Sequence, residues 1–214
     1  MMRTFRLFFG VLGAAALLLA SFQPGHAASQ SDAALSRLIA LDSAIHSYVA
    51  DVRADVAMHT FPYLSPSLTG IYYHKAPNKD KIVFTGGLPL IAQQFNNLYP
   101  HLEPPSRWSQ VYAISTEHED GTYVQLKLLP KDRSHIDHID AKIGVRSGEL
   151  VQMRWNYTDG GYALLNQSYG KVGNYMLVTQ QSGHFQDPNY NADVMSHFNN
   201  FKLNASIPDS VFAE

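Results

Sequence analysis

The sequence has no cysteine, few charged residues and only one long apolar run. The absence of cysteine excludes a disulfide scaffold, a thiol nucleophile, a Cys-ligated metal and a cysteine-linked lipid anchor. Charged residues make up 16% of the chain and the formal net charge is −2. A chain with so few charges and a slightly negative net charge has no strongly basic surface to attract nucleic acid, so we expect no nucleic-acid partner.

The single long apolar run lies at the N-terminus, from Leu7 to Ala20, and follows two arginines. Its 14 residues fall short of the roughly 20 that a bilayer-spanning helix needs. Small residues stand just before a candidate signal-peptidase cleavage site after Ala27, and this completes the pattern of a secretory signal. We therefore expect residues 1–27 to be a cleaved signal peptide. Residues 28–214 would then form a single domain that is free in the periplasm, without a lipid anchor.

Aromatic residues are plentiful, with 12 Tyr and 11 Phe, which suits a protein built on a β-sheet. Apolar and polar residues alternate with period two in segments such as 52–59, 122–129 and 151–157, and this period is typical of strands. About ten such segments follow one another without a βαβ rhythm, which predicts an antiparallel sheet. Another strand is expected from Trp108 to Glu117 and a last one at 201–205, whereas the stretch 183–195 is polar and irregular.

Two segments have helical periodicity. The first extends from residue 31 to Tyr48 and has one apolar face, interrupted only by Asp42. The second is short, begins at Leu88 and places Ile91 and Phe95 on one side. The predicted fold class is therefore mainly β (α+β): one strongly curved antiparallel sheet whose concave side is covered by these two helices.

The densest group of candidate metal ligands is His135, Asp137, His138 and Asp140. In an extended chain, the first two would share one face and the last two the other. A metal site would then need distant ligands, such as His118 or His184. We expect neither a metal nor a cofactor.

Ser168 and Lys171 match the Ser-x-x-Lys motif of penicillin-binding enzymes. In those enzymes the serine opens a helix, whereas Ser168 lies late in a predicted strand. The accompanying Ser-Asp-Asn and Lys-Thr-Gly motifs are absent from the sequence. No nucleophile with its base is recognised, and we expect the protein not to be an enzyme.

The sheet's concave face would carry Val, Leu, Met, Trp and Tyr side chains and needs a cover. Two helices with one apolar stripe each would either fill this space as a close-packed core or leave a hydrophobic cavity. Residue types alone favour the close-packed core, but composition does not settle the question.

Two segments resemble periplasmic lipoprotein carriers of the LolA type. The segment from Gly70 through Tyr72 and Pro77 to Lys79 is similar to their Gly-x-x-Tyr-x-x-x-Pro-x-Lys segment, and residues 198–212 are similar to their closing strand. The resemblance implies an incomplete barrel closed by a helical lid. It also implies a cavity that accepts acyl chains of lipoproteins or other lipids.

The resulting hypothesis is a monomeric, non-enzymatic periplasmic carrier that shields the acyl chains of a lipoprotein or lipid and is loaded and emptied at envelope membrane proteins. Shielding is required because each exposed CH₂ costs about 0.8 kcal/mol in water. The first alternative is a sensor or protein-interaction domain of the same fold, and the second is a metal-assisted hydrolase using the 135–140 cluster. The candidate cavity lining comprises Leu38, Val56, Met58, Tyr72, Ile91, Phe95, Val124, Leu126, Met153 and Trp155.

Overall fold

The computed structural model describes residues 29–60, 65–77, 79–85, 103–188 and 191–213. The predicted signal peptide and the predicted second helix with Ile91 and Phe95 lie outside these ranges. The strands are β1 (Ser47–Met58), β2 (Ser67–Lys75), β3 (Lys79–Phe84), β4 (Tyr112–Glu119), β5 (Tyr123–Pro130), β6 (Ile136–Gly144), β7 (Leu150–Tyr157), β8 (Tyr162–Val172), β9 (Tyr175–Gln186) and β10 (Asn191–Leu203).

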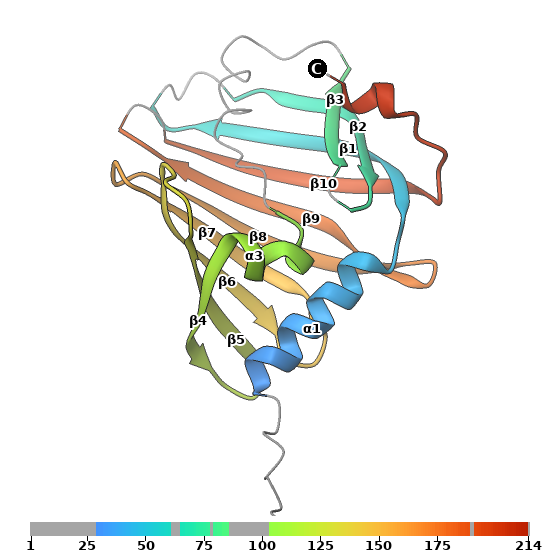
Figure 1. The fold of residues 1–214 in the computed structure, drawn as a ribbon. Coiled ribbons are helices and arrows are strands. Elements are labelled where there is room, and N and C mark those ends of the chain that lie inside the picture. The colour runs from blue at the N-terminus through green and yellow to red at the C-terminus, as the bar shows by residue number, and fades with distance from the viewer. Residues whose placement is uncertain (1–28, 61–64, 78, 86–102, 189–190, 214) are drawn as a thin grey trace, which may run out of the picture.

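All ten strands belong to one antiparallel sheet in the order β3-β2-β1-β10-β9-β8-β7-β6-β5-β4. Figure 1 shows that the sheet is strongly curved and that helix α1 (Gln30–Ser43) crosses its concave side. β3 and β4 are the two edges and do not pair with each other, so the sheet stays open. The predicted fold class is confirmed.

Helix α1 begins where the sequence provides a cap. The Ser29 hydroxyl accepts a hydrogen bond from the Asp32 amide at 3.1 Å, which satisfies one free amide of the first turn. The helix ends at Ser43, so the prediction of a helix through Tyr48 was wrong. Tyr48 belongs to β1, where it pairs with His74 on one side and Leu203 on the other. Pairing on both sides outweighs the local helical periodicity.

The prediction of a strand that begins at Trp108 was also wrong for its first 4 residues, which are helical. Pro105–Arg107 form the 3₁₀ turn η2, and Trp108–Val111 form the short helix α3 before β4 starts. Trp108 is wholly buried against the main core, and its Nε1 donates to the Glu103 carbonyl oxygen at 2.7 Å. The chain thus enters β4 through two short helical turns that bury this indole.

The stretch 183–195, expected to be irregular, is mostly strand. It contains the end of β9 and the start of β10, where Phe185 pairs with Ala192 and His184 with Asp193. Phe185 and Ala192 are buried on the concave face, whereas His184 and Asp193 point to the outer face. Polar residues on that outer face hid the alternation.

The two segments that resemble the carriers meet in space. Lys75 and Lys79 both donate to the Asp209 carboxylate, at 2.8 and 2.9 Å, at the start of the C-terminal turn η3 (Asp209–Phe212). Lys79 Nζ also lies 5.9 Å from the centre of the Phe212 ring. The C-terminal segment is thereby fixed to the β2–β3 hairpin.

This contact predicts a pH-dependent contribution to stability. The two lysines lower the pKa of Asp209 from 3.8 to about 2, so the folded state favours the carboxylate. Its contribution is present above pH 4 and is lost as the pH falls through about 2. In urea unfolding, Asp209→Asn should be less stable than the wild type at neutral pH, and the two should converge toward pH 2. A difference that is independent of pH would contradict this role.

Candidate ligand-binding face

Rows of cross-strand partners build the concave face, because paired residues project from the same side of a sheet. One row consists of Ile114, Leu128, Ile139, Trp155, Ala163, Phe185, Ala192 and Met58. The next row consists of Leu126, Ala141, Met153, Leu165, Gly183, Val194 and Val56. Candidate residues from three strands that are distant in sequence, β1, β5 and β7, therefore share one face.

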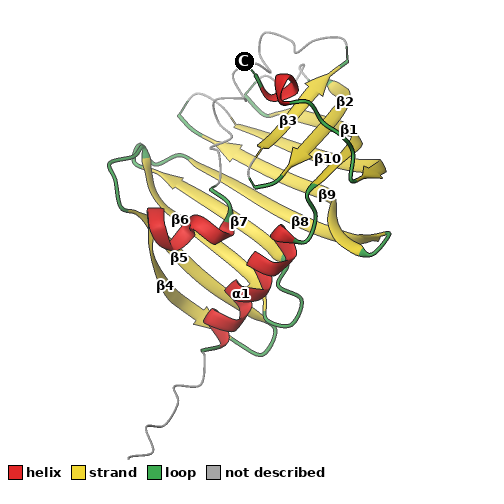
Figure 2. Cartoon of the chain, turned by 45° about the vertical axis from the view of Figure 1, so that its right-hand side comes forward, coloured by secondary structure: helices red, strands yellow, loops and turns green. Residues whose placement is uncertain are grey.

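One half of this face is packed under α1, which Figure 2 shows lying across it. Leu38 of α1 and Trp108 belong to the same buried cluster as the candidate residues of β5 and β7. These candidates are Val124, Leu126, Met153 and Trp155. This half of the face is a close-packed core.

The other candidate residues that the structure describes lie in two smaller clusters. Val56 and Met58 pack with Ala192. Tyr72 packs against a cluster of Ile45, Tyr48 and Leu177. The candidate lining is thus divided among three clusters along one continuous face.

Short side chains occupy β1 between these two smaller clusters. Ala50, Val52 and Ala54 are only 1%, 2% and 6% exposed, yet they belong to none of the three apolar clusters that the described residues form. Gly70 lies opposite Val52, and Ser196 lies opposite Ala54. We call these five residues the β1 floor. All five residues have short side chains or none.

Gly70 is required by the sheet itself. A Cβ atom at this position would lie 2.6 Å from the Val83 carbonyl oxygen on β3, which is closer than side chains tolerate. Glycine at this position therefore permits the close approach of β3. It also adds no side chain to the β1 floor.

A group of polar and aromatic side chains lies at one end of the β1 floor. The Tyr72 hydroxyl donates to Asp80 Oδ1, and His74 Nδ1 lies 2.8 Å from the same oxygen. The Tyr48 ring stacks on the His74 ring with centroids 4.9 Å apart. Asp42 approaches from the last turn of α1 and interacts electrostatically with His74 and Asp80. We call Asp42, Tyr48, Tyr72, His74 and Asp80 the polar-aromatic cluster.

Burial determines the protonation of this cluster. It raises the pKa of Tyr48 and of Tyr72 well above 10, and the nearby Asp80 charge adds to both shifts, so both hydroxyls remain protonated. Burial also raises the pKa of Asp42, although His74 opposes the change. Because Asp80 accepts the Nδ1 proton, neutral His74 presents Nε2 as an acceptor. That atom is buried and has no hydrogen-bond partner among the described residues.

Sequence reasoning selected Tyr72 but missed the rest of the cluster. One signal was present, since Asp42 interrupts the apolar face of the first helix. Its neighbours His74 and Asp80 were not recognisable, because the β2–β3 pairing that places them side by side is a tertiary feature.

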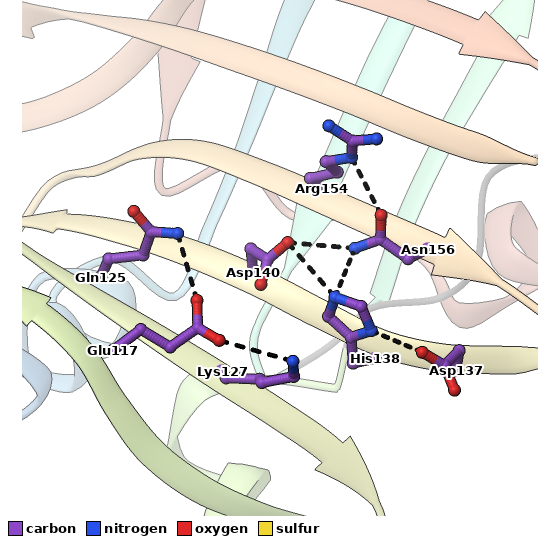
Figure 3. Close-up of polar contacts among 8 residues, drawn as sticks. All are labelled: Glu117, Gln125, Lys127, Asp137, His138, Asp140, Arg154 and Asn156. Atoms are coloured by element: carbon purple, nitrogen blue, oxygen red, sulfur yellow. Dashed lines mark hydrogen bonds and ion pairs between the residues drawn. The ribbon is translucent and has the colours of Figure 1, made fainter.

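Three of the candidate metal ligands, Asp137, His138 and Asp140, lie in a polar network on the outer face, which Figure 3 shows across β4 to β7. His138 Nδ1 lies 2.7 Å from Asp137, and its Nε2 lies 3.0 Å from Asn156 Nδ2. The same Asn156 amide donates to Asp140 at 3.0 Å. A register shift between Ile136 and His138 brings Asp137 beside His138, although alternation alone would separate them. Both nitrogens of His138 are therefore engaged.

The remaining candidate ligands lie elsewhere. The His135 ring stacks on Tyr157, His118 lies beside Asp120, and His184 Nδ1 lies 2.6 Å from Asp193. In the described ranges, no group of three or more His, Asp or Glu side chains is arranged to hold a metal ion. Ser168 is inside β8 and does not open a helix, unlike the serine of penicillin-binding enzymes.

Solved structures share this architecture. A domain named for outer membrane lipoprotein sorting from Vibrio parahaemolyticus superposes with a TM-score of 0.63 at 10% identity, covering 84% of this chain and 94% of its own. A LolA superfamily protein from Nitrosomonas europaea gives a TM-score of 0.60 at 13% identity, covering 88% of this chain and 98% of its own. A DUF1329 family protein from Desulfovibrio piger gives 0.61 at 11% identity, covering 85% and 96%.

No family model matches the sequence. No curated protein matches it significantly in sequence either. At 10–13% identity, the likeness to solved structures establishes the fold alone. The chain has a LolA-like fold, and at that level the resemblance seen in the sequence is confirmed. None of the helices in the part of the chain that the structure describes is long and apolar enough to cross a bilayer.

Proposed function

We propose that the protein is a non-enzymatic carrier that shields the acyl chains of a lipoprotein or lipid over the β1 floor while they cross the periplasm. The observation that supports this most is the β1 floor itself: buried, short side chains, apolar except for Ser196, that lie outside the close-packed clusters of the described residues. We expect an extended acyl chain to lie along this strip, and burying it would recover about 0.8 kcal/mol per CH₂.

The two halves of the concave face would then have different roles. The half under α1 is a close-packed core that holds the sheet in its curved shape. The half over β1, β2 and β10 would receive the ligand. No covalent step is needed for shielding, and the signal-like N-terminus fits export to the periplasm.

A matched pair of substitutions on β1 tests the carrier function. Ala54→Phe would place a ring over the β1 floor, whereas Ala57→Phe would place it on the exposed outer face of the same strand. We expect the wild type and Ala57→Phe to bind a fluorescent acyl probe with an uncharged end, and Ala54→Phe to bind it at least about tenfold more weakly with little loss of stability. In a filled core, overpacking would cost roughly 1–3 kcal/mol.

The readouts are probe titration and urea unfolding of the same three proteins. Failure of the wild type to bind the probe would overturn the carrier function. A large loss of stability in Ala54→Phe, with unchanged probe binding, would place the ligand elsewhere.

A protein-interaction domain of the same fold is the second candidate function. Ile82 and Val83 are partly exposed apolar residues on the edge strand β3, where another chain could add a strand. A wild type that binds no acyl probe would favour this candidate.

A further inference from the structure

We propose that the polar-aromatic cluster is a recognition site for the head group of the bound amphiphile, and that the head group it selects is a primary ammonium. The proposal rests on the carrier function and adds the chemical class of the ligand's polar end. His74 and Asp42 would make the direct contacts.

The first argument is the unused acceptor. His74 Nε2 is buried and has no hydrogen-bond partner among the described residues, while Nδ1 is held by Asp80. A buried polar atom without a partner is costly, so such an atom beside a binding surface indicates a ligand donor. An ammonium group carries three N–H donors and no acceptor, which suits this atom and the Asp42 carboxylate together.

The second argument is charge. Asp42 and Asp80 contribute two carboxylates around a single imidazole, and the two tyrosine hydroxyls remain neutral. The cluster therefore attracts a cation and repels the carboxylate of a fatty acid or the phosphate of a phospholipid.

The third argument is that aromatic rings surround the cluster. Tyr72 packs edge-on against Phe198 with centroids 5.4 Å apart, and Tyr48 lies 5.8 Å from Phe201. Aromatic faces favour a cation within about 6 Å, and a partly desolvated site strengthens the attraction.

The fourth argument is the position of the cluster. Tyr72 pairs directly with Ala50, so the cluster adjoins the β1 floor. The His74 side chain is only 12% exposed, whereas that of Asp80 is 46% exposed. An amphiphile would therefore lay its chain along the floor and place its head group where the site begins to meet solvent.

The test compares three ligands of equal chain length by calorimetry below their micellar concentrations: decylammonium, decanol and decanoate. We expect the wild type to bind decylammonium about tenfold more tightly than decanol, and decanoate most weakly. Asp42→Asn should remove this preference by weakening decylammonium about tenfold while leaving decanol nearly unchanged. His74→Phe keeps the stack on Tyr48 and should weaken both decylammonium and decanol. Asp132→Asn and His46→Phe change exposed residues and are the matched controls.

The outcomes separate this proposal from the carrier function. A wild type that binds all three ligands equally, or decanoate most tightly, would overturn the recognition site and leave the carrier standing. Binding of none of the three would overturn both. If His74→Phe does not fold, Asp42→Asn alone decides, and a uniform loss for all three ligands would show a merely structural role.

Discussion

Met153→Glu should lower the free energy of unfolding by roughly 3–5 kcal/mol, because it places a carboxylate in a dry, close-packed core. Met153 is 3% exposed, pairs with Ala141 and Leu165, and belongs to the cluster beneath α1. Its surroundings are apolar, so the new charge would be without compensation. The sequence alone left open whether this position lines a cavity, and its packing within this cluster favours the core.

Urea unfolding followed by tryptophan fluorescence and by circular dichroism measures this effect. Met176→Glu is the matched control, since it makes the same chemical change at a partly exposed methionine and should alter stability by less than about 0.5 kcal/mol. A nearly unchanged midpoint for Met153→Glu would mean that the half of the face under α1 is solvent-accessible and could hold ligand.

Trp108→Ala is expected to cost roughly 3–5 kcal/mol. Trp108 is the largest of the side chains found fully buried in the described ranges, and it joins η2 and α3 to the core that α1 covers. Truncation would leave a large cavity, and the Nε1 bond to the Glu103 carbonyl oxygen would also be lost. Both effects act in the same direction.

Trp108→Phe separates these two effects, because it retains most of the ring volume but has no donor. Its loss of stability should be clearly smaller than that of Trp108→Ala when both are measured by urea unfolding. Equal losses for the two variants would show that the hydrogen bond, and not the packing, determines the local path. Leu129→Ala, at an exposed position, should change little.

The main core could be predicted because apolar and polar residues alternate regularly along its strands. On β7, Met153 and Trp155 alternate with Gln152, Arg154 and Asn156, and the structure buries the first pair and directs the others outward. This pattern is a property of one strand and its burial, so it is readable without knowing the strand's neighbours.

The other features of the fold and the candidate site could not be predicted from the sequence, because they depend on tertiary contacts. The end of α1 at Ser43 follows from the two-sided pairing of Tyr48, which local periodicity does not contain. The β1 floor was visible only as part of an apolar stripe, because Ala50 and Ala54 do not distinguish a packed position from one that leaves space. The meeting of Asp42, His74 and Asp80 likewise depends on three separate elements.

The sheet order has a consequence for how the chain folds. β1 is made early but pairs with β10, which is made last, so the β1–β10 ladder joins residues separated by most of the chain. Contacts of such long range slow folding, because a large loop must be ordered before they form. Until β10 arrives, one side of β1 is an open hydrogen-bonding edge that other chains could pair with. The strand that carries the β1 floor is thus vulnerable to aggregation until β10 has been made, and it becomes protected in the same step that completes the proposed ligand-binding face.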